Sequence, residues 1–177
     1  PLNLEMAATK EMLDIAIKHK PNACCIVPEK RQEVTTEGGL NLNANIDKLS
    51  DCIDKLKGNA IRVSLFIDPQ KKDIEIAKEL GADIVEIHTG SFANNFNKNG
   101  EIHSDEFDHL NNVSIFAHEI GLEVHAGHGL TFETARVISR INVLKELNIG
   151  HFIIGEAVFE GLDCVIKKFR AILNSER

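Results

Sequence analysis

The chain has 177 residues, of which 43% are hydrophobic and 27% are charged, and its formal net charge is −7. These values are typical of one soluble globular domain with enough length to bury a core. The acidic balance argues against nonspecific binding to nucleic acid or to a membrane surface, because both are themselves negatively charged. Local binding of phosphate remains open, since backbone N–H groups hold an anion without bulk positive charge.

Four cysteines occur, Cys24 and Cys25 side by side and Cys52 and Cys164 singly, without any C-x-x-C pair. This spacing predicts neither a disulfide framework nor a zinc cage, and it indicates reduced thiols in a cytoplasmic protein. In an extended strand the side chains of Cys24 and Cys25 point to opposite faces of the sheet. No apolar run reaches the roughly 20 residues of a membrane span. We therefore expect neither a membrane nor a nucleic acid as a partner.

Short apolar runs alternate with amphipathic segments along the whole chain. In chain order, strands are expected at 2–4, 23–27, 61–67, 84–87 and 123–126. Helices are expected at 9–18, 45–57, 68–80 and 104–120, from Thr131 onwards, and at 162–174. The residues between the strand at 84–87 and the helix at 104–120 are predicted to form a long polar loop.

The last strand has two possible positions in the sequence. Phe152-Ile153-Ile154 is the more apolar run, whereas Leu147-Asn148-Ile149 fits better if Gly150-His151 marks the end of a strand. In the second case the residues from Phe152 to Phe159 form a short extra helix before the final one. Periodicity alone does not decide between these alternatives.

The repeated strand–helix order predicts an α/β fold with a parallel sheet and helical crossovers. Six such units are visible in the sequence. A doubly wound sheet uses about six strands, whereas a (β/α)8 TIM barrel needs eight and usually more than about 200 residues. Because the chain begins directly at a strand, we interpret residues 1–177 as a single TIM-barrel domain. On this interpretation it contains units 3 to 8, and the first two units are absent.

Three of the predicted strands end on groups that move protons: Glu5, the pair Glu86 and His88, and His128. The carboxyl ends of barrel strands open onto one face of the barrel, where active sites lie. Glu5 is a candidate general base, with a helix cap or a partner of a lysine as the alternative. Glu86 and His88 share one face of their strand. They form either a catalytic pair in the pocket or a buried ion pair that supports the barrel.

Gly127-His128-Gly129 is the most informative motif. Glycine on both sides permits backbone conformations and close ligand approach that other residues block, and imidazole titrates near neutral pH. Thr131 opens the next helix, whose free N–H groups attract anions. Gly150-His151 and Gly155 offer a second set of N–H groups, where barrels often bind phosphate. The alternatives are a turn with an incidental histidine and ordinary glycines at strand–helix junctions.

The loop at 28–40 is unusually long for a strand–helix connection. Its mixed charges and paired glycines suit a lid that closes over a ligand, and a solvated flexible loop is the alternative. A metal site made of Glu5, Glu86 and His128 is the weaker interpretation, because the sequence has no His-x-x-x-His spacing. It also has no G-x-G-x-x-G or Walker motif, which argues against a dinucleotide or ATP cofactor.

Six blocks, spread in order along nearly the whole chain, resemble the pyridoxine 5′-phosphate synthase family. They are Asn-Leu-Glu-Met-Ala at 3–7, Val-Pro-Glu-Lys-Arg-Gln-Glu-Val-Thr-Thr-Glu-Gly-Gly-Leu at 27–40, Val-Ser-Leu-Phe-Ile-Asp at 63–68, Glu-Ile-His-Thr-Gly at 86–90, Ala-Gly-His-Gly-Leu-Thr at 126–131 and Glu-Leu-Asn-Ile-Gly-His at 146–151. The resemblance implies a (β/α)8 barrel that assembles as a homo-octamer and needs no metal or organic cofactor. The implied reaction joins 3-amino-2-oxopropyl phosphate to 1-deoxy-D-xylulose 5-phosphate and yields pyridoxine 5′-phosphate, inorganic phosphate and water.

The same resemblance implies roles for individual residues. Glu5 would accept protons, His128 would donate them, and Glu86 would stabilise charge on the intermediates. Thr35, in the lid block, would contact deoxyxylulose phosphate.

The phosphate of the aminooxopropyl substrate would be held by Gly129, Gly150 and His151. This assignment favours the position of the last strand at 147–149. The alternative functions are another phosphate-binding barrel isomerase or aldolase, and an inactive barrel fragment that acts only in binding or assembly.

Overall fold

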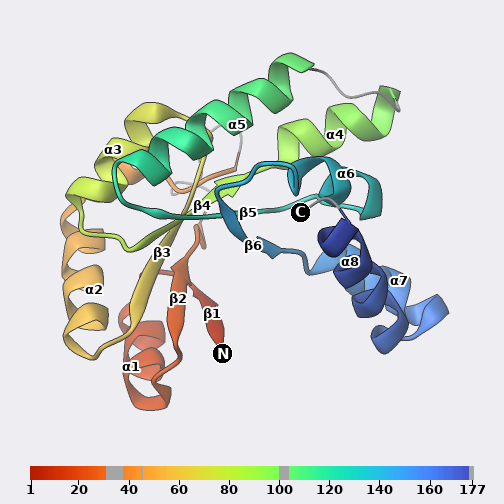
Figure 1. Cartoon of the computed structure of the whole chain (residues 1–177). Helices are drawn as coiled ribbons and strands as arrows, with labels where there is room; N and C mark the ends of the chain where they lie inside the picture. The colour runs from red at the N-terminus through yellow and green to blue at the C-terminus, as the bar shows by residue number, and fades with distance from the viewer. Residues whose placement is uncertain (31–37, 45, 100–103, 176–177) are drawn as a thin grey trace.

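The computed structural model describes residues 1–30, 38–44, 46–99 and 104–175. Within them it has a parallel sheet of six strands, with helices on the connections (Figure 1). The strands are β1 (Asn3–Met6), β2 (Ala23–Ile26), β3 (Arg62–Ile67), β4 (Ile84–His88), β5 (Glu123–Gly127) and β6 (Leu144–Asn148). The helices are α1 (Lys10–His19), α2 (Ile46–Gly58), α3 (Lys71–Glu79), α4 (Gly90–Asn99), α5 (Ser104–Glu119), α6 (Phe132–Ile138), α7 (His151–Glu160) and α8 (Leu162–Ser175), and η2 (Leu42–Ala44) is a 3-10 turn.

The strands follow one another in the sheet in the order of the chain, each pairing in parallel with the next. A doubly wound sheet reverses its strand order at a switch point, so this topology is that of a barrel. The sheet is also curved: the side-chain amide of Asn3 on β1 donates to Glu146 Oε1 on β6, 3.4 Å away. The described residues thus form an open, barrel-like sheet.

The two faces of the sheet differ in polarity because successive strand side chains alternate in direction. The outward side chains are apolar and make up the main core with α2, α3 and α5; they include Ile26, Leu65, Val85, Ile87 and Val124. The inner face carries Glu5, Cys25, Ser64, Glu86 and His125. Each fully buried Leu, Ile or Val contributes roughly 1.5–3 kcal/mol to folding. The outer face therefore holds the sheet together, and the inner face is left for polar groups.

The adjacent cysteines follow this alternation. Cys24 belongs to the main core, whereas the Cys25 thiol contacts Glu86 on the inner face. The prediction that their side chains point to opposite faces is confirmed.

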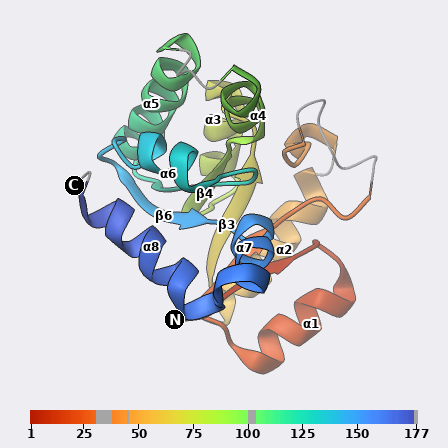
Figure 2. The same ribbon diagram turned by 90° about the vertical axis from the view of Figure 1, so that its right-hand side faces the viewer.

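The helices at the carboxyl end of the chain form a second, smaller packing unit. Phe169 of α8 packs against Phe132 and Phe152, with ring centroids 4.6 and 6.1 Å away. Figure 1 shows α7 and α8 next to β6, on the opposite side of the sheet from α2, and Figure 2 shows α8 beside β6 in the turned view. The start of α7 is thereby fixed next to the carboxyl end of β6.

The predicted strands and helices occur with ends that differ by no more than three residues, except at two places. The last strand agrees with the alternative at 147–149, although β6 begins earlier, at Leu144. Phe152-Ile153-Ile154 instead lies in α7, where it packs on α8. Of the helices in the described residues, none is long and apolar enough to cross a lipid bilayer.

The polar loop predicted after the strand at 84–87 is wrong, because α4 occupies most of it. Phe92 and Ala93 are buried, and the rings of Phe92 and Phe96 lie 6.2 Å apart, one helical turn from each other. Three apolar residues among four asparagines and one serine are enough to dock this helix. Tertiary packing, which is absent from a local sequence pattern, stabilises it.

Candidate active site

A pocket of about 860 Å³ opens at the carboxyl ends of the strands. Six of the seven residues predicted for the site line it: Glu5, Glu86, His128, Gly129, Gly150 and His151. They come from β1, β4, the loop after β5 and the start of α7, so the curved sheet brings together residues more than a hundred positions apart. The seventh, Thr35, lies outside the described residues, as does most of the predicted lid.

Glu86 is the most buried carboxylate in this pocket, with 3% of its surface exposed. Its Oε2 accepts two hydrogen bonds, from Asn148 Nδ2 at 2.6 Å and from the Cys25 thiol at 3.2 Å. Burial raises the pKa of Glu86 to about 7, and the carboxylate of Glu5 adds to this, although both hydrogen bonds oppose it. Glu86 is therefore divided between its charged and neutral forms at neutral pH.

His128 follows β5 in a left-handed backbone conformation, with φ of +78°, and Gly129 has the same φ. This conformation is rare for a residue with a side chain and marks a constrained site. The Thr89 hydroxyl oxygen lies 2.7 Å from the Gly127 carbonyl oxygen and 2.8 Å from that of His128, so its one hydrogen is shared between them and fixes the turn. The imidazole of His128 is thereby directed from a rigid turn into the pocket.

His88 lies directly behind His128. It is buried, and its ring is in edge contact with Phe66 at 5.1 Å between centroids. Its Nδ1 lies 3.8 Å from Asp68 Oδ1. Burial lowers the pKa of His88, and the neighbouring His128 lowers it further, against the opposing effect of Asp68. Glu86 and His88 share one face of β4, as predicted, but only Glu86 lines the larger pocket, whereas His88 lines a smaller one.

The two candidate phosphate-binding helix starts differ. In α6, Thr131 and Thr134 form a reciprocal capping box that already satisfies two N–H groups. In α7, the N-cap residue Gly150 makes no side-chain cap, and Gly150, His151 and Phe152 line the pocket. The free N–H groups at the start of α7 are the better cradle for a phosphate. Gly155 lies inside α7 and away from the pocket, so its predicted part in this cradle is wrong.

Sequence reasoning missed Asn148 and Phe66, which also line the pocket. Asn148 ends β6, and its strand neighbour on β5 is Gly127. A strand at Leu147-Asn148-Ile149 would have placed Asn148 at a strand end, next to the pocket. The sequence left the position of the last strand open, so it did not identify Asn148.

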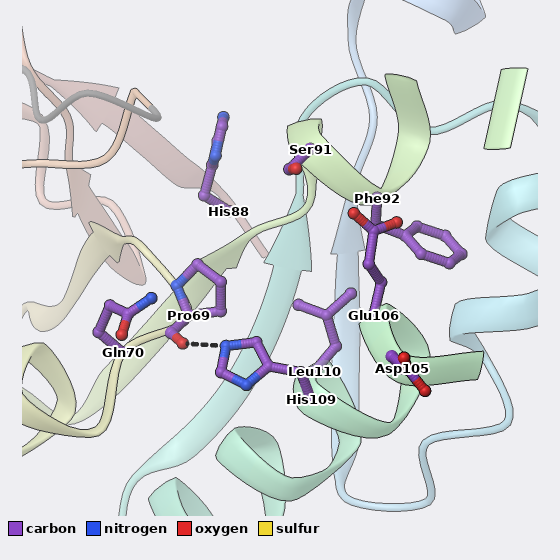
Figure 3. Close-up of a pocket in the computed structure, with 9 residues that line it drawn as sticks. All are labelled: Pro69, Gln70, His88, Ser91, Phe92, Asp105, Glu106, His109 and Leu110. Carbon is purple, nitrogen blue, oxygen red and sulfur yellow. Dashed lines mark hydrogen bonds between the residues drawn. The ribbon is translucent and has the colours of Figure 1, made fainter. Parts of the chain in front are cut away.

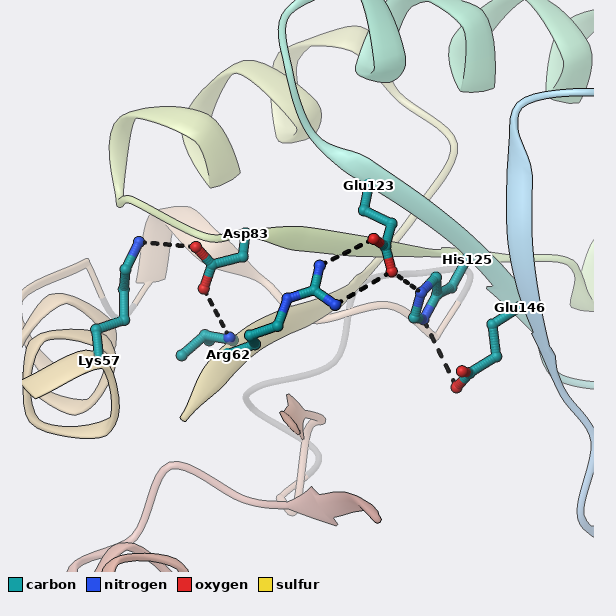
Figure 4. Close-up of polar contacts among 7 residues, drawn as sticks. Lys57, Arg62, Asp83, Glu123, His125 and Glu146 are labelled. Carbon is teal, nitrogen blue, oxygen red and sulfur yellow. Dashed lines mark hydrogen bonds and ion pairs between the residues drawn. The ribbon is translucent and has the colours of Figure 1, made fainter. Parts of the chain in front are cut away.

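A second polar network lies on the inner face, at the amino ends of the strands (Figure 4). Arg62 pairs with Glu123 at 2.9 Å, and Glu123 also accepts from His125 Nε2 at 2.9 Å. Burial alone would raise the pKa of Glu123, but the hydrogen bonds from Arg62 and His125 bring it below its ordinary value. This network connects β3, β5 and, through Glu146, β6.

A smaller pocket of about 260 Å³ lies between α4, α5 and the loop after β3 (Figure 3). His109 contacts the carbonyl of Pro69 there, with Nε2 2.7 Å from the oxygen. The side chain of His88, which also lines this pocket, points away from His109 (Figure 3). The smaller pocket is lined by four titratable side chains of its own, His88, Asp105, Glu106 and His109.

Comparison with known proteins shows the family and agrees with the fold. The pyridoxine 5′-phosphate synthase of Zymomonas mobilis subsp. mobilis is 49% identical over 177 residues, which are 100% of this chain and 68% of that protein. The pyridoxine 5′-phosphate synthase of Gluconobacter oxydans is 50% identical over 175 residues, or 99% of this chain and 72% of that protein.

Solved structures show the fold at lower identity. The citrate synthase SbnG has a TM-score of 0.59 at 10% identity, covering 98% of this chain and 73% of that one. A structure titled native KDPGal has a TM-score of 0.61 at 12% identity, covering 96% and 68%. Residues 1–175 match the family described as pyridoxal phosphate biosynthesis protein PdxJ. The chain belongs to the PdxJ family.

Proposed function

We propose that this protein is a pyridoxine 5′-phosphate synthase. It would condense 3-amino-2-oxopropyl phosphate with 1-deoxy-D-xylulose 5-phosphate and release inorganic phosphate and water, which makes it a ring-closing transferase. Membership of the PdxJ family and the names of the relatives support this reaction. The observation that carries the proposal is the convergence of Glu5, Glu86 and His128 on one pocket next to the α7 cradle.

The reaction needs repeated proton transfers, for imine formation, enolisation, loss of water and phosphate, and ring closure. Glu5 acts as the proton acceptor and His128 as the donor, and both line the pocket. Glu86 is buried and has a pKa of about 7, so it gains and loses a proton readily at neutral pH. It is therefore suited to stabilising the charge that forms on successive intermediates. The imine joins the two substrates, so no enzyme lysine is needed as a nucleophile.

Substrate binding rests on backbone groups at two loops. The N–H groups of Gly150 and His151, together with Gly129, would hold the phosphate of the aminooxopropyl substrate. Thr35, in the lid block, would contact deoxyxylulose phosphate. No metal or organic cofactor is part of the proposal, because proton transfers and an imine between the substrates account for the chemistry.

The assembly and setting are proposed on the same family resemblance. The six strand–helix units take the places of units 3 to 8 of a (β/α)8 barrel within one domain. The protein works in the cytoplasm as a homo-octamer.

The test is to mix the purified protein with both phosphorylated substrates, without added metal, and to follow pyridoxine 5′-phosphate by absorbance and mass. We expect product from the wild type and a strongly reduced rate from Glu5→Gln, which keeps the size of the side chain but removes its charge. Absence of product from the wild type would overturn the proposal and favour a protein that only binds or assembles. Product from a single phosphorylated substrate would favour an isomerase or aldolase instead.

A further inference from the structure

The contact between Glu86 and Asn148 crosses an intervening strand. Glu86 is on β4 and Asn148 ends β6, so β5 lies between them in the sheet. Asn148 Nδ2 nevertheless lies 2.6 Å from Glu86 Oε2. The strand residue between them is Gly127, which pairs with both His88 on β4 and Asn148 on β6.

Gly127 makes this contact possible because it has no side chain. A Cβ atom there would collide with Glu86 Oε1 and would lie 2.8 Å from the Asn148 carbonyl oxygen and 3.1 Å from Asn148 Cβ. These separations are shorter than carbon atoms tolerate without movement of their neighbours. The glycine therefore opens a passage on the inner face through which the amide reaches the carboxylate.

Cys25 approaches the same oxygen from the other side. It lies on β2, it is fully buried, and its thiol is 3.2 Å from Glu86 Oε2. Within the described residues both donors end on Oε2, and Oε1 takes neither bond. A carboxyl group whose one oxygen accepts two donors carries its proton on the other oxygen, because a proton on the first would meet the donors head-on.

We infer that Asn148 and Cys25 are positioning residues for Glu86, which hold Oε2 and leave Oε1 as the oxygen that exchanges a proton or meets substrate charge. This inference rests on the proposed function only for its kinetic consequence. The positioning itself is a property of the folded protein.

The electrostatics agree with this geometry. Each donor stabilises the charged form of Glu86, so each holds its pKa lower than burial alone would set it. The other titratable groups near Glu86 are Glu5 on β1 and Glu146 on β6, which raise its pKa, and His125, its strand neighbour on β5. Loss of Asn148 or Cys25 as a donor therefore raises the pKa of Glu86.

The experiment measures the pKa of Glu86 directly, by carbon-13 NMR of protein labelled at the glutamate carboxyl carbons, with Glu86→Gln used to assign the signal. We expect a midpoint near 7 in the wild type and a higher one in Asn148→Leu and Cys25→Ala. Cys25→Ser restores a donor and should return the midpoint towards the wild-type value. Cys24→Ala is the matched control, since it removes the same group from the other face of β2 and should leave the midpoint unchanged.

Kinetics provide the second arm. If the protein makes pyridoxine 5′-phosphate, Asn148→Leu should lower kcat roughly ten- to a hundredfold with little change in KM, and the pH profile of kcat should move to higher pH. An unchanged midpoint in both Asn148→Leu and Cys25→Ala would overturn the positioning inference while leaving the synthase proposal intact. A shifted midpoint in a protein that makes no product would sustain the positioning and overturn the proposed function.

Discussion

The imidazole rings of His88 and His128 lie 5.0 Å apart between centroids and are tilted by 35°. Burial keeps the pKa of His88 low, and a charge on His128 would lower it further. His88 is therefore uncharged at neutral pH, and its buried ring packs against the ring of His128.

The His128→Asn variant should lose turnover roughly a hundred- to ten-thousandfold, the usual contribution of a general acid. Asparagine tolerates the left-handed backbone of this position, where φ is +78°, better than most residues do. Thermal unfolding should therefore be close to that of the wild type. His19→Asn, at an exposed position in the last turn of α1, is the control and should keep full activity. Near-normal turnover in His128→Asn would remove His128 from the mechanism.

The Gly150→Val variant should weaken binding of 3-amino-2-oxopropyl phosphate, measured by titration calorimetry. A Cβ at Gly150 meets no atom within 4 Å, so the fold accepts the substitution while the side chain blocks approach to the N–H groups of α7. Gly155→Val is the matched control, because that glycine also faces open space but does not line the pocket. Equal affinity in the two variants would refute the cradle at the start of α7.

The stability of the protein should carry a pH dependence that belongs to Glu86. Its pKa is raised from 4.5 to about 7 by burial, so the folded state holds the proton more tightly than the unfolded chain does. This stabilisation is fully present below pH 4.5 and is lost as the pH rises through about 7. At about 1.4 kcal/mol per pH unit, the loss amounts to roughly 3 kcal/mol in the free energy of unfolding.

Urea denaturation of the wild type and Glu86→Gln, at pH 5 and at pH 8, measures this effect. The difference between the two proteins isolates Glu86 from His88, whose lowered pKa acts in the opposite direction. If the free energy of unfolding changed between pH 5 and pH 8 by the same amount in both proteins, the prediction would be contradicted.

Thiol reactivity tests the packing of the sheet. Cys24, Cys25 and Cys52 are buried and Cys164 is exposed. Burial also raises the pKa of Cys24 and Cys52 to about 11, so their reactive thiolate forms are scarce. In the native protein we expect Cys164 to react rapidly with a water-soluble aromatic disulfide and the other three only after denaturation. The Cys164→Ser variant should show no rapid phase; a rapid phase there would mean that the sheet opens readily.

Much of this protein follows from its sequence. The alternation of apolar runs with amphipathic helices predicted the parallel strands, because these signals are local. Glu5, Glu86 and His128 were recognisable because each stands at or just beyond the end of such a run. In a parallel sheet, strand ends share one edge, so position in the strand was enough to group them.

Other features depended on contacts between distant segments. The helix α4 exists because Phe92 and Ala93 find a place in the core, which the polar sequence around them does not indicate. The choice between two positions for the last strand was made by the packing of Phe152 against α8 rather than by periodicity.

The sequence by itself determined the fold class, the strand ends and the titratable residues that line the pocket, because periodicity and residue chemistry are local properties. Only the tertiary structure decided which atoms meet. The bond from Asn148 to Glu86 requires the curvature of the sheet and the missing side chain of Gly127 between them. Burial by the folded chain then sets the charge of Glu86, because the cost of removing a carboxylate from water depends on its surroundings in three dimensions.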